Sequence, residues 1–159
     1  MQPFKQNPAS LGAEGAATAA TAVTQAVGAW ISAFNQHDAA RVAALYHPDA
    51  VLWGTLSAEI MTSADAVRAY FERTFNFNPP PTVGLGLNLV RVFGDTAVAS
   101  GDYTLEFLIA GQSHLMPARF SFTYRLNAGE SGESGKEWLI VDHHSSLVPA
   151  APPQVVAAD

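Results

Sequence analysis

The sequence predicts a single α+β domain in which helices come first and a curved, mainly antiparallel sheet follows. Before the prolines at 79–81, apolar residues recur every three or four positions, as they do on one face of a helix. After these prolines, apolar and polar residues alternate as in strands, and glycines separate the runs. The 159 residues suffice for one domain. This order of elements predicts a cone-shaped sheet covered by the N-terminal helices.

Three helices are expected in the first half of the chain. An apolar stripe predicts a helix over about residues 18–35; it comprises Ala22, Val23, Ala26, Val27, Trp30, Ile31 and Phe34. Asp38 is a favourable N-cap for a short helix through Leu45, which the dipeptide at 47–48 would end. The Thr-Ser-Ala-Asp segment 62–65 starts a third helix, which the prolines after Asn78 stop.

Five strands are expected. The short apolar segment 51–56 predicts the first strand. Four longer strands follow the prolines, over residues 85–93, 96–109, 115–125 and 137–146. Gly94 and Asp95 predict a tight hairpin between the first two of these, and glycine-containing turns separate the others.

These elements predict one domain over residues 18–149, between a flexible N-terminal segment 1–17 and a Pro/Ala-rich tail 150–159. The prolines of the tail cannot donate backbone hydrogen bonds, so no strand is expected there. No apolar run is long enough to span a bilayer, and no basic leader precedes an apolar segment. We therefore expect a soluble protein with no membrane partner, and the cytoplasm is the favoured compartment.

The composition excludes several kinds of site. Acidic residues outnumber basic ones by 14 to 8, and no cluster of lysine and arginine exists that could neutralise a run of phosphates. A nucleic-acid partner is therefore not expected. The chain contains no cysteine, which excludes disulfides, thiolate zinc sites and cysteine nucleophiles. A metal would need histidine and carboxylate ligands.

The most unusual segment is 137–149, where an apolar strand changes abruptly to five polar residues. In a regular strand, alternate side chains share a face, and one face should carry Trp138, Ile140, Asp142, His144 and Ser146. The other face should carry Leu139, Val141, His143 and Ser145. From the residues alone, one histidine could equally be a hydrogen-bonded wall residue, with the serines closing the strand.

This ending, Trp-Leu-Ile-Val-Asp-His-His-Ser-Ser-Leu-Val-Pro over 138–149, together with Leu-Trp-Gly-Thr-Leu-Ser over 52–57, resembles the iota-class carbonic anhydrases. The resemblance covers about residues 22–149 and implies a nuclear-transport-factor-2-like cone. SnoaL-like cyclases, ketosteroid isomerase and the association domain of calcium/calmodulin-dependent kinase II share this fold. The chain departs from the class at Asp142, where most members carry a further histidine. The superfamily resemblance also implies a homodimer through the outer face of the sheet.

Carried over residue by residue, the resemblance implies a small pocket for carbon dioxide and bicarbonate lined by Thr55, Tyr70, His144 and Ser146. Because some members of the class act without a metal, neither a metal nor another cofactor is expected. From the residues alone, each of the four could equally serve the fold, for example as a strand former or a core tyrosine. Residues of second rank for substrate binding are Tyr103, Arg119, Tyr124, His143 and Ser145.

The implied reaction is the reversible hydration of carbon dioxide, in which water must lose a proton as it attacks carbon. Forming free hydroxide at neutral pH costs roughly 12 kcal/mol, because the pKa of water lies about 9 units above neutrality. His144 is expected to accept this proton as a general base, while the hydroxyls orient water and stabilise charge. A metal site built from His114, Asp142 and His144 stays open as an alternative.

Two other functions also remain open. A SnoaL-like or ketosteroid-isomerase-like enzyme would act on a larger apolar substrate, with Asp102 or Asp142 as the base beside Tyr70. A non-catalytic module would oligomerise or bind a small ligand, since this fold serves many functions. A bicarbonate-sized polar pocket would favour carbonic anhydrase, a deep apolar pocket the isomerase, and an occluded cone with a large ring interface the module.

Overall fold

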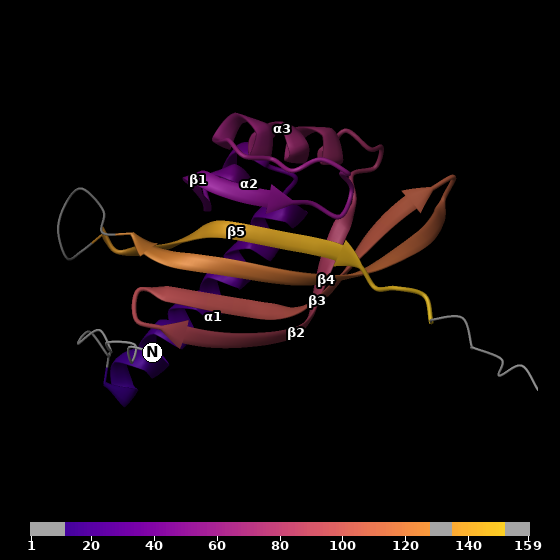
Figure 1. Cartoon of the computed structure of the whole chain (residues 1–159). Coiled ribbons are helices and arrows are strands. Elements are labelled where there is room, and N and C mark those ends of the chain that lie inside the picture. Colours follow the sequence, from indigo (N-terminus) through magenta and orange to yellow (C-terminus); the bar gives the residue numbers. More distant parts are fainter. Residues whose placement is uncertain (1–11, 128–134, 152–159) are drawn as a thin grey trace, which may run out of the picture.

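The computed structural model describes residues 12–127 and 135–151 and confirms the α+β prediction. The elements are α1 (Ala13–Asn35), α2 (Ala39–Ala43), β1 (Tyr46–Trp53), α3 (Ala64–Phe75), β2 (Thr82–Phe93), β3 (Thr96–Ile109), β4 (Gln112–Asn127) and β5 (Glu137–Leu147). The five strands form one curved sheet in the order β1-β5-β4-β3-β2 (Figure 1). Within the described residues, no helix has the length and apolar character needed to cross a membrane. Residues 1–11 and 152–159 of the two predicted terminal segments lie outside this description.

The helices begin and end close to the predicted positions. Helix α1 starts at Ala13 rather than near residue 18, because the alanine-rich segment before it continues the helix. The Asp38 side chain caps α2 by accepting a hydrogen bond from the backbone N–H of Arg41. Ser63 caps α3 in the same way.

The predicted end of α2 at Leu45 is wrong, as is the predicted start of the first strand at residue 51. Helix α2 ends at Ala43, and β1 begins at Tyr46 and continues through Pro48. Proline is tolerated because β1 is an edge strand, on which one side of the backbone needs no sheet partner. Tyr46 therefore becomes a buried strand residue at the bottom of the cone.

The sheet is a meander with one added parallel strand. Phe93 pairs with Thr96 across Gly94 and Asp95, which confirms the predicted hairpin. The β3–β4 turn uses Ala110 and Gly111 in the left-handed region, with φ of 52° and 77°. Strand β1 pairs in parallel with β5, while the other three pairings are antiparallel.

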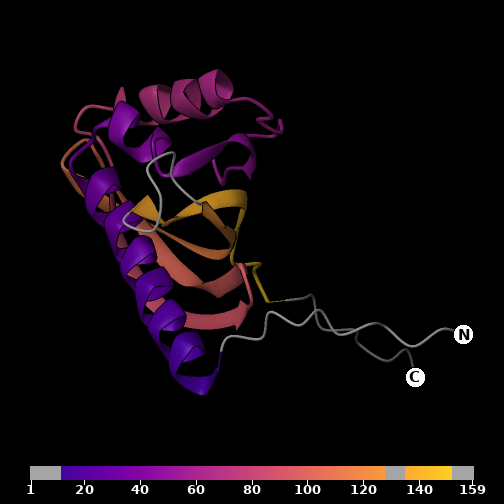
Figure 2. The ribbon, with the colours of Figure 1, turned by 90° about the vertical axis from the view of Figure 1, so that its left-hand side faces the viewer.

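Helix α1 crosses the concave face of the sheet, and α3 lies at the β1 end (Figure 2). The Asn35 side chain links α1 to β2 through two hydrogen bonds. Its Nδ2 donates to the Val83 carbonyl at 2.9 Å, and its Oδ1 accepts the Val83 N–H at 2.8 Å. Trp30 lies at the centre of the core and contacts the rings of Phe34, Phe71, Tyr103, Phe122 and His143. The concave face is thus filled mainly by aromatic side chains.

Strand β5 contains a β-bulge that changes which residues face inward. Thr123 pairs with Asp142 and Tyr124 pairs with Ile140, so Val141 is an extra residue opposite β4. Ile140 faces the core before the bulge, whereas His143 and Ser145 face it afterwards. Asp142 and His144 are exposed on the outer face. The prediction that Ile140, His144 and Ser146 share one face is therefore wrong, because it assumed strict alternation.

Candidate active site

A small, partly open cavity lies inside the cone, between α1, α3, the segment after β1, and strands β3 and β5. Its volume is about 10 Å³ for the centre of a water-sized molecule, close to the room that one water needs. The lining is aromatic and aliphatic apart from a few polar groups. The lining residues are Trp30, Phe34, Gly54, Thr55, Leu56, Tyr70, Phe71, Thr74, Tyr103, Leu105, His143 and Ser145.

The structure brings together some of the predicted site residues and separates others. Thr55 and Tyr70 line the cavity, as do three residues of second rank, Tyr103, His143 and Ser145. His144 and Ser146 do not line the cavity, because the bulge at Val141 turns their side chains to the outer face. The expectation that they join Thr55 and Tyr70 around one centre is therefore corrected: the adjacent His143 and Ser145 occupy those places.

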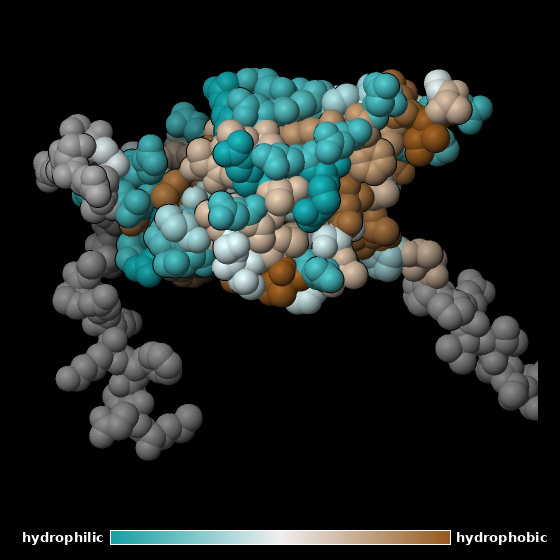
Figure 3. Space-filling view, turned by 90° about the horizontal axis from the view of Figure 1, so that it is seen from above, coloured by the Kyte–Doolittle hydropathy of each residue, from teal (hydrophilic) through white to brown (hydrophobic). Residues whose placement is uncertain are grey.

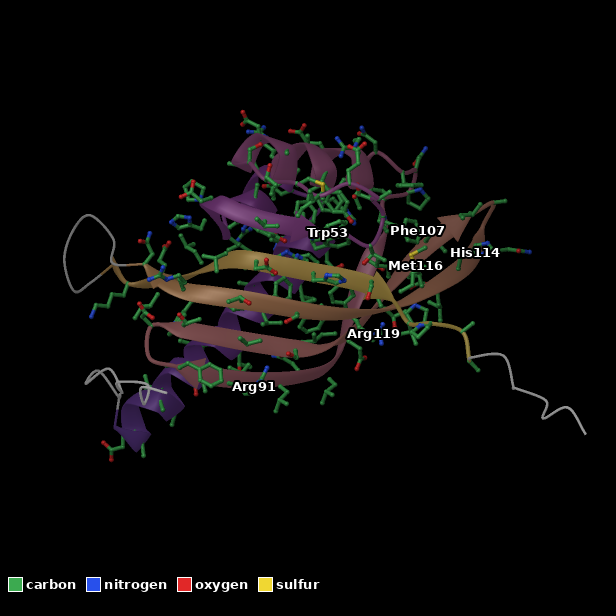
Figure 4. All side chains as sticks on the ribbon, viewed as in Figure 1. Trp53, Arg91, Phe107, His114, Met116 and Arg119 are labelled. Atoms are coloured by element: carbon green, nitrogen blue, oxygen red, sulfur yellow. The ribbon has the colours of Figure 1, made fainter. Side chains whose placement is uncertain are left out.

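The other two residues of second rank also lie away from the cavity. Arg119 is exposed on the outer face of β4, where its register partners are Asp102 and Ser146 (Figure 4). Tyr124 is buried on the inner face but lies outside the cavity lining. The Tyr124 hydroxyl has no hydrogen-bond partner among the described residues, and burial raises its pKa.

The polar residues of the cavity form a connected chain of hydrogen bonds. Trp30 Nε1 donates to the Tyr46 hydroxyl at 3.0 Å, and this hydroxyl lies 2.7 Å from His143 Nδ1. The Tyr103 hydroxyl uses its hydrogen on Ser145 Oγ, so His143 Nε2 must donate to Tyr103, and Nδ1 is left to accept the proton of Tyr46. His143 then carries its own proton on Nε2, which lies 3.5 Å from the Tyr103 hydroxyl. These hydrogen bonds therefore fix which ring nitrogen of His143 carries the proton.

The chain continues to the cavity through hydroxyl groups. The Tyr103 hydroxyl donates to Ser145 Oγ at 2.6 Å, and Ser145 Oγ is hydrogen-bonded to Thr55 Oγ1. The Ser145–Thr55 bond uses one of the two hydroxyl hydrogens of this pair. The second hydrogen is left for a molecule in the cavity.

Tyr70 supplies another hydrogen-bond donor to this cavity. Its oxygen accepts the backbone N–H of Leu56 at 3.3 Å, which leaves the hydroxyl hydrogen to donate. Gly54 permits this position, since a Cβ atom there would lie 2.3 Å from the Tyr70 ring. The glycine of the Trp-Gly-Thr segment therefore has a packing role that the sequence analysis did not assign.

No side chain of this cavity changes its charge near neutral pH. Burial lowers the pKa of His143 to about 3, and the neighbouring His144 adds to the effect. Burial raises the pKa of Tyr70 and of Tyr103 above the usual value of 10. The cavity therefore presents neutral hydroxyls and a neutral imidazole over the whole physiological range.

The alternative metal site is contradicted by the positions of its ligands. His114 pairs with Phe107 and His144 pairs with Ser121, so seven residues of β4 separate them, about 23 Å at the usual rise. His114 lies on the projecting β3–β4 hairpin, away from Trp53, whose ring stacks with that of His144 (Figure 4). In residues 12–127 and 135–151, no three histidine or carboxylate groups lie close enough together to hold a metal. The cavity itself offers one imidazole and hydroxyls, a poor donor set for zinc.

The carboxylates suggested for an isomerase also lie outside the cavity. Asp102 is exposed, and its carboxylate accepts the backbone N–H of Leu87 at 3.3 Å. Asp142 is exposed on the outer face of β5. Neither can reach a substrate beside Tyr70.

Two residues of the hydrogen-bond chain were missed as site residues. Trp30 was expected only in the core stripe of the first helix, and Tyr46 was expected between the second helix and the first strand. A buried tyrosine at the start of a strand has no local sequence signal for its partner. Only the pairing of Tyr46 with Ile140 across β1 and β5 brings its ring near His143.

A larger cavity of about 340 Å³ adjoins the first, and we call it the vestibule. It is lined by Leu56, Ser57, Tyr70, Arg73, Thr74 and Phe77. Three of these residues, Leu56, Tyr70 and Thr74, also line the inner cavity. These three residues therefore form the boundary between the inner cavity and the vestibule.

Comparisons with known proteins agree with this fold. A crystal structure from Xanthomonas campestris, described as a candidate calcium/calmodulin-dependent protein kinase II association domain, is 30% identical, with a TM-score of 0.69 over 94% of this chain and 100% of that one. A candidate dehydratase of the nuclear-transport-factor-2-like family from Streptomyces avermitilis is 16% identical, with a TM-score of 0.72 over 85% of this chain and 99% of that one. The kinase II hub of S. rosetta is 16% identical, with a TM-score of 0.68 over 81% and 96%.

No curated protein matches the chain. The family model for the SnoaL-like domain matches residues 23–151, which include every described strand, α2, α3 and the second half of α1. The structures at 16% identity share the fold, and the Xanthomonas protein is similar over its whole length. The chain therefore belongs to the SnoaL-like domain family, with a nuclear-transport-factor-2-like cone.

Proposed function

We propose that the protein is a carbonic anhydrase in which the inner cavity, with room for about one water, holds the attacking water, while carbon dioxide or bicarbonate lies against Tyr70 between the two cavities. The observation that carries this proposal is a cavity of about 10 Å³ whose free polar hydrogens belong to Tyr70 and to the Thr55–Ser145 pair. Two hydroxyl donors beside one small space match two oxygens of a small planar substrate. The cavity is too small for a polycyclic one, and the motif resemblance supports the same substrate.

The neutral lining favours a hydroxyl relay over a general base. Water bonds through its oxygen to the carbon of carbon dioxide and passes one proton to the Thr55–Ser145 pair. The pair returns a proton to an oxygen of the former carbon dioxide, so that the product is carbonic acid. Tyr70 donates a hydrogen bond to the oxygen on which charge accumulates. This route avoids free hydroxide and requires no residue to become charged; carbonic acid releases its proton to bulk water.

This mechanism predicts that the hydration rate is nearly constant between about pH 5 and pH 9. His143 stays neutral because its lowered pKa lies below this range, and Tyr70 stays protonated because its raised pKa lies above it. Stopped-flow measurement of carbon dioxide hydration by purified protein, corrected for buffer and hydroxide, checks the prediction.

The same assay has two outcomes that contradict the proposal. A rate that never exceeds the buffer rate at any pH would remove the carbonic anhydrase function. A rate that rises through an inflection near pH 7 would retain the function but require an ionising base or a metal-bound water. Assays before and after chelation separate these two, and we expect no change on chelation.

A second candidate is a proton-transfer enzyme of the dehydratase or isomerase kind, and the vestibule favours it. A larger substrate could lie in the vestibule and place one carbonyl oxygen against the Tyr70 hydroxyl. This reaction needs a base, and neither cavity has a carboxylate among its described lining residues. Binding of phenol without binding of bicarbonate, followed by tyrosine absorbance, would favour this candidate over carbonic anhydrase.

We also propose that the protein forms a homodimer through the outer face of the sheet. The row Leu89, Ser100, Ser121, His144 and Trp53 runs across all five strands, and its two large apolar ends are 56% and 42% exposed. Light scattering should give about twice the chain mass of 16.8 kDa. Ser121→Arg, at the centre of this row, should give the single-chain mass.

A single-chain mass for the unaltered protein would contradict the dimer. A larger ring would instead favour an assembly of the kind that the word hub denotes in the S. rosetta structure. Asp65→Asn, on the exposed first turn of α3 and away from the outer face, serves as the matched control.

A further inference from the structure

A charged side chain lines the vestibule. Arg73 lies exposed in the last turn of α3 and, among the described residues that line this cavity, is the only charged one. Among the described ion pairs, Arg68 is paired with Glu72 and Arg125 with Asp95, whereas Arg73 has no such partner. An arginine without a carboxylate partner is free to bind an anion.

The surroundings of Arg73 connect it to the inner cavity. Tyr70 lies three residues before Arg73 on α3 and lines both cavities. The positive charge of Arg73 lowers the pKa of the Tyr70 hydroxyl, although burial raises it more strongly. Phe77 forms an apolar wall of the vestibule, and its ring packs against Phe107 at 5.3 Å. Apolar residues gather at this end of the molecule, which carries the β3–β4 hairpin (Figure 3).

We propose that the vestibule is a second binding site for a small oxyanion of the bicarbonate class and that Arg73 is the residue that selects it. The proposal rests on the proposed function for the identity of the anion. The planar guanidinium can donate two parallel hydrogen bonds to two oxygens of bicarbonate. The chain has a net charge of -6, which repels anions, so a local positive site at the entrance raises the anion concentration where it is needed.

Arg73 could instead serve only the fold, since a cation in the last turn of a helix interacts favourably with the helix dipole. That role predicts a small change in stability and no change in anion binding. The two roles are therefore separated by a binding measurement on folded protein.

The test is a titration with sodium bicarbonate followed by the backbone amide signals of Leu56 and Ser57 in NMR spectra. Arg73→Gln should weaken binding about tenfold, the usual effect of losing a charge-assisted hydrogen bond. Arg73→Lys should retain part of the affinity, because it keeps the charge but not the planar fork. Arg68→Gln, on the same helix and paired with Glu72, should bind like the unaltered protein. Added sodium chloride should weaken binding to the unaltered protein more than to Arg73→Gln.

Equal bicarbonate affinity in the unaltered protein and Arg73→Gln would overturn this inference, as would the absence of any shift at Leu56 and Ser57. Either result leaves the hydration assay to decide the function of the inner cavity. Conversely, Arg73-dependent binding in a protein that does not hydrate carbon dioxide would support the anion site and remove the carbonic anhydrase proposal.

Discussion

Replacing Ser145 with alanine is expected to lower the rate of carbon dioxide hydration about 100-fold, whereas replacing Ser146 with alanine changes it less than about twofold. Ser145 supplies a hydroxyl to the inner cavity, and loss of one preorganised donor commonly costs ~100-fold or more. Ser146 lies on the outer face beside Arg119 and contributes nothing to the cavity. Stopped-flow assays on the two variants measure the difference directly.

The same pair of variants should differ in stability. Ser145→Ala leaves the buried Tyr103 hydroxyl without the acceptor that lies 2.6 Å away, at a cost of about 1–3 kcal/mol in the free energy of unfolding. Urea unfolding checks this value, and Ser146→Ala is the matched control. If Ser146→Ala loses the activity and Ser145→Ala keeps it, the site geometry is wrong, because the chemistry would lie on the outer face.

Ser145 lines the cavity, although Ser146 was the serine expected there, and the sequence alone could not predict this exchange. The alternation rule correctly places His143 and His144 on opposite faces of β5. Which of the two faces inward depends on the bulge at Val141, which arises from pairing with β4 and has no signal in the strand itself. Because of this one extra residue, His143 and Ser145 face the cavity in place of the predicted pair, His144 and Ser146.

The fold was more predictable because it depends on repeated signals. The apolar stripe of α1, the caps at Asp38 and Ser63, and the Gly94-Asp95 hairpin each have a local cause in the chain. Tyr70 reaches the cavity because it lies on α3, which the cap at Ser63 defines, whereas Thr55 lies in the turn after β1, although it was expected in the first strand. The position of Tyr46 depends instead on the parallel pairing of two strands that are about ninety residues apart.

Tyr46→Phe is expected to lower the free energy of unfolding by about 2–6 kcal/mol. The Tyr46 hydroxyl is the shared partner of Trp30 Nε1 and His143 Nδ1, so its removal leaves two buried polar groups unpaired, each at about 1–3 kcal/mol. Thermal or urea unfolding measures this loss. Tyr124→Phe is the matched control, since the buried Tyr124 hydroxyl has no hydrogen-bond partner among the described residues. This second change should be neutral or stabilising.

A loss of stability alone would not show whether Tyr46 only stabilises the core or also positions His143. The tautomer of His143 distinguishes these two roles. In the unaltered protein, Tyr46 donates to Nδ1 and the proton of His143 resides on Nε2. Nitrogen NMR should show this single tautomer, and Tyr46→Phe should allow the proton to move to Nδ1. In that form Nε2 becomes an acceptor, and the Tyr103 hydroxyl can turn from Ser145 towards His143. Hydration activity would then fall without any change in a group that touches the substrate. A proton on Nδ1 of the unaltered protein would contradict this account, because Tyr46 would then be an acceptor and could not fix the hydroxyls of the cavity.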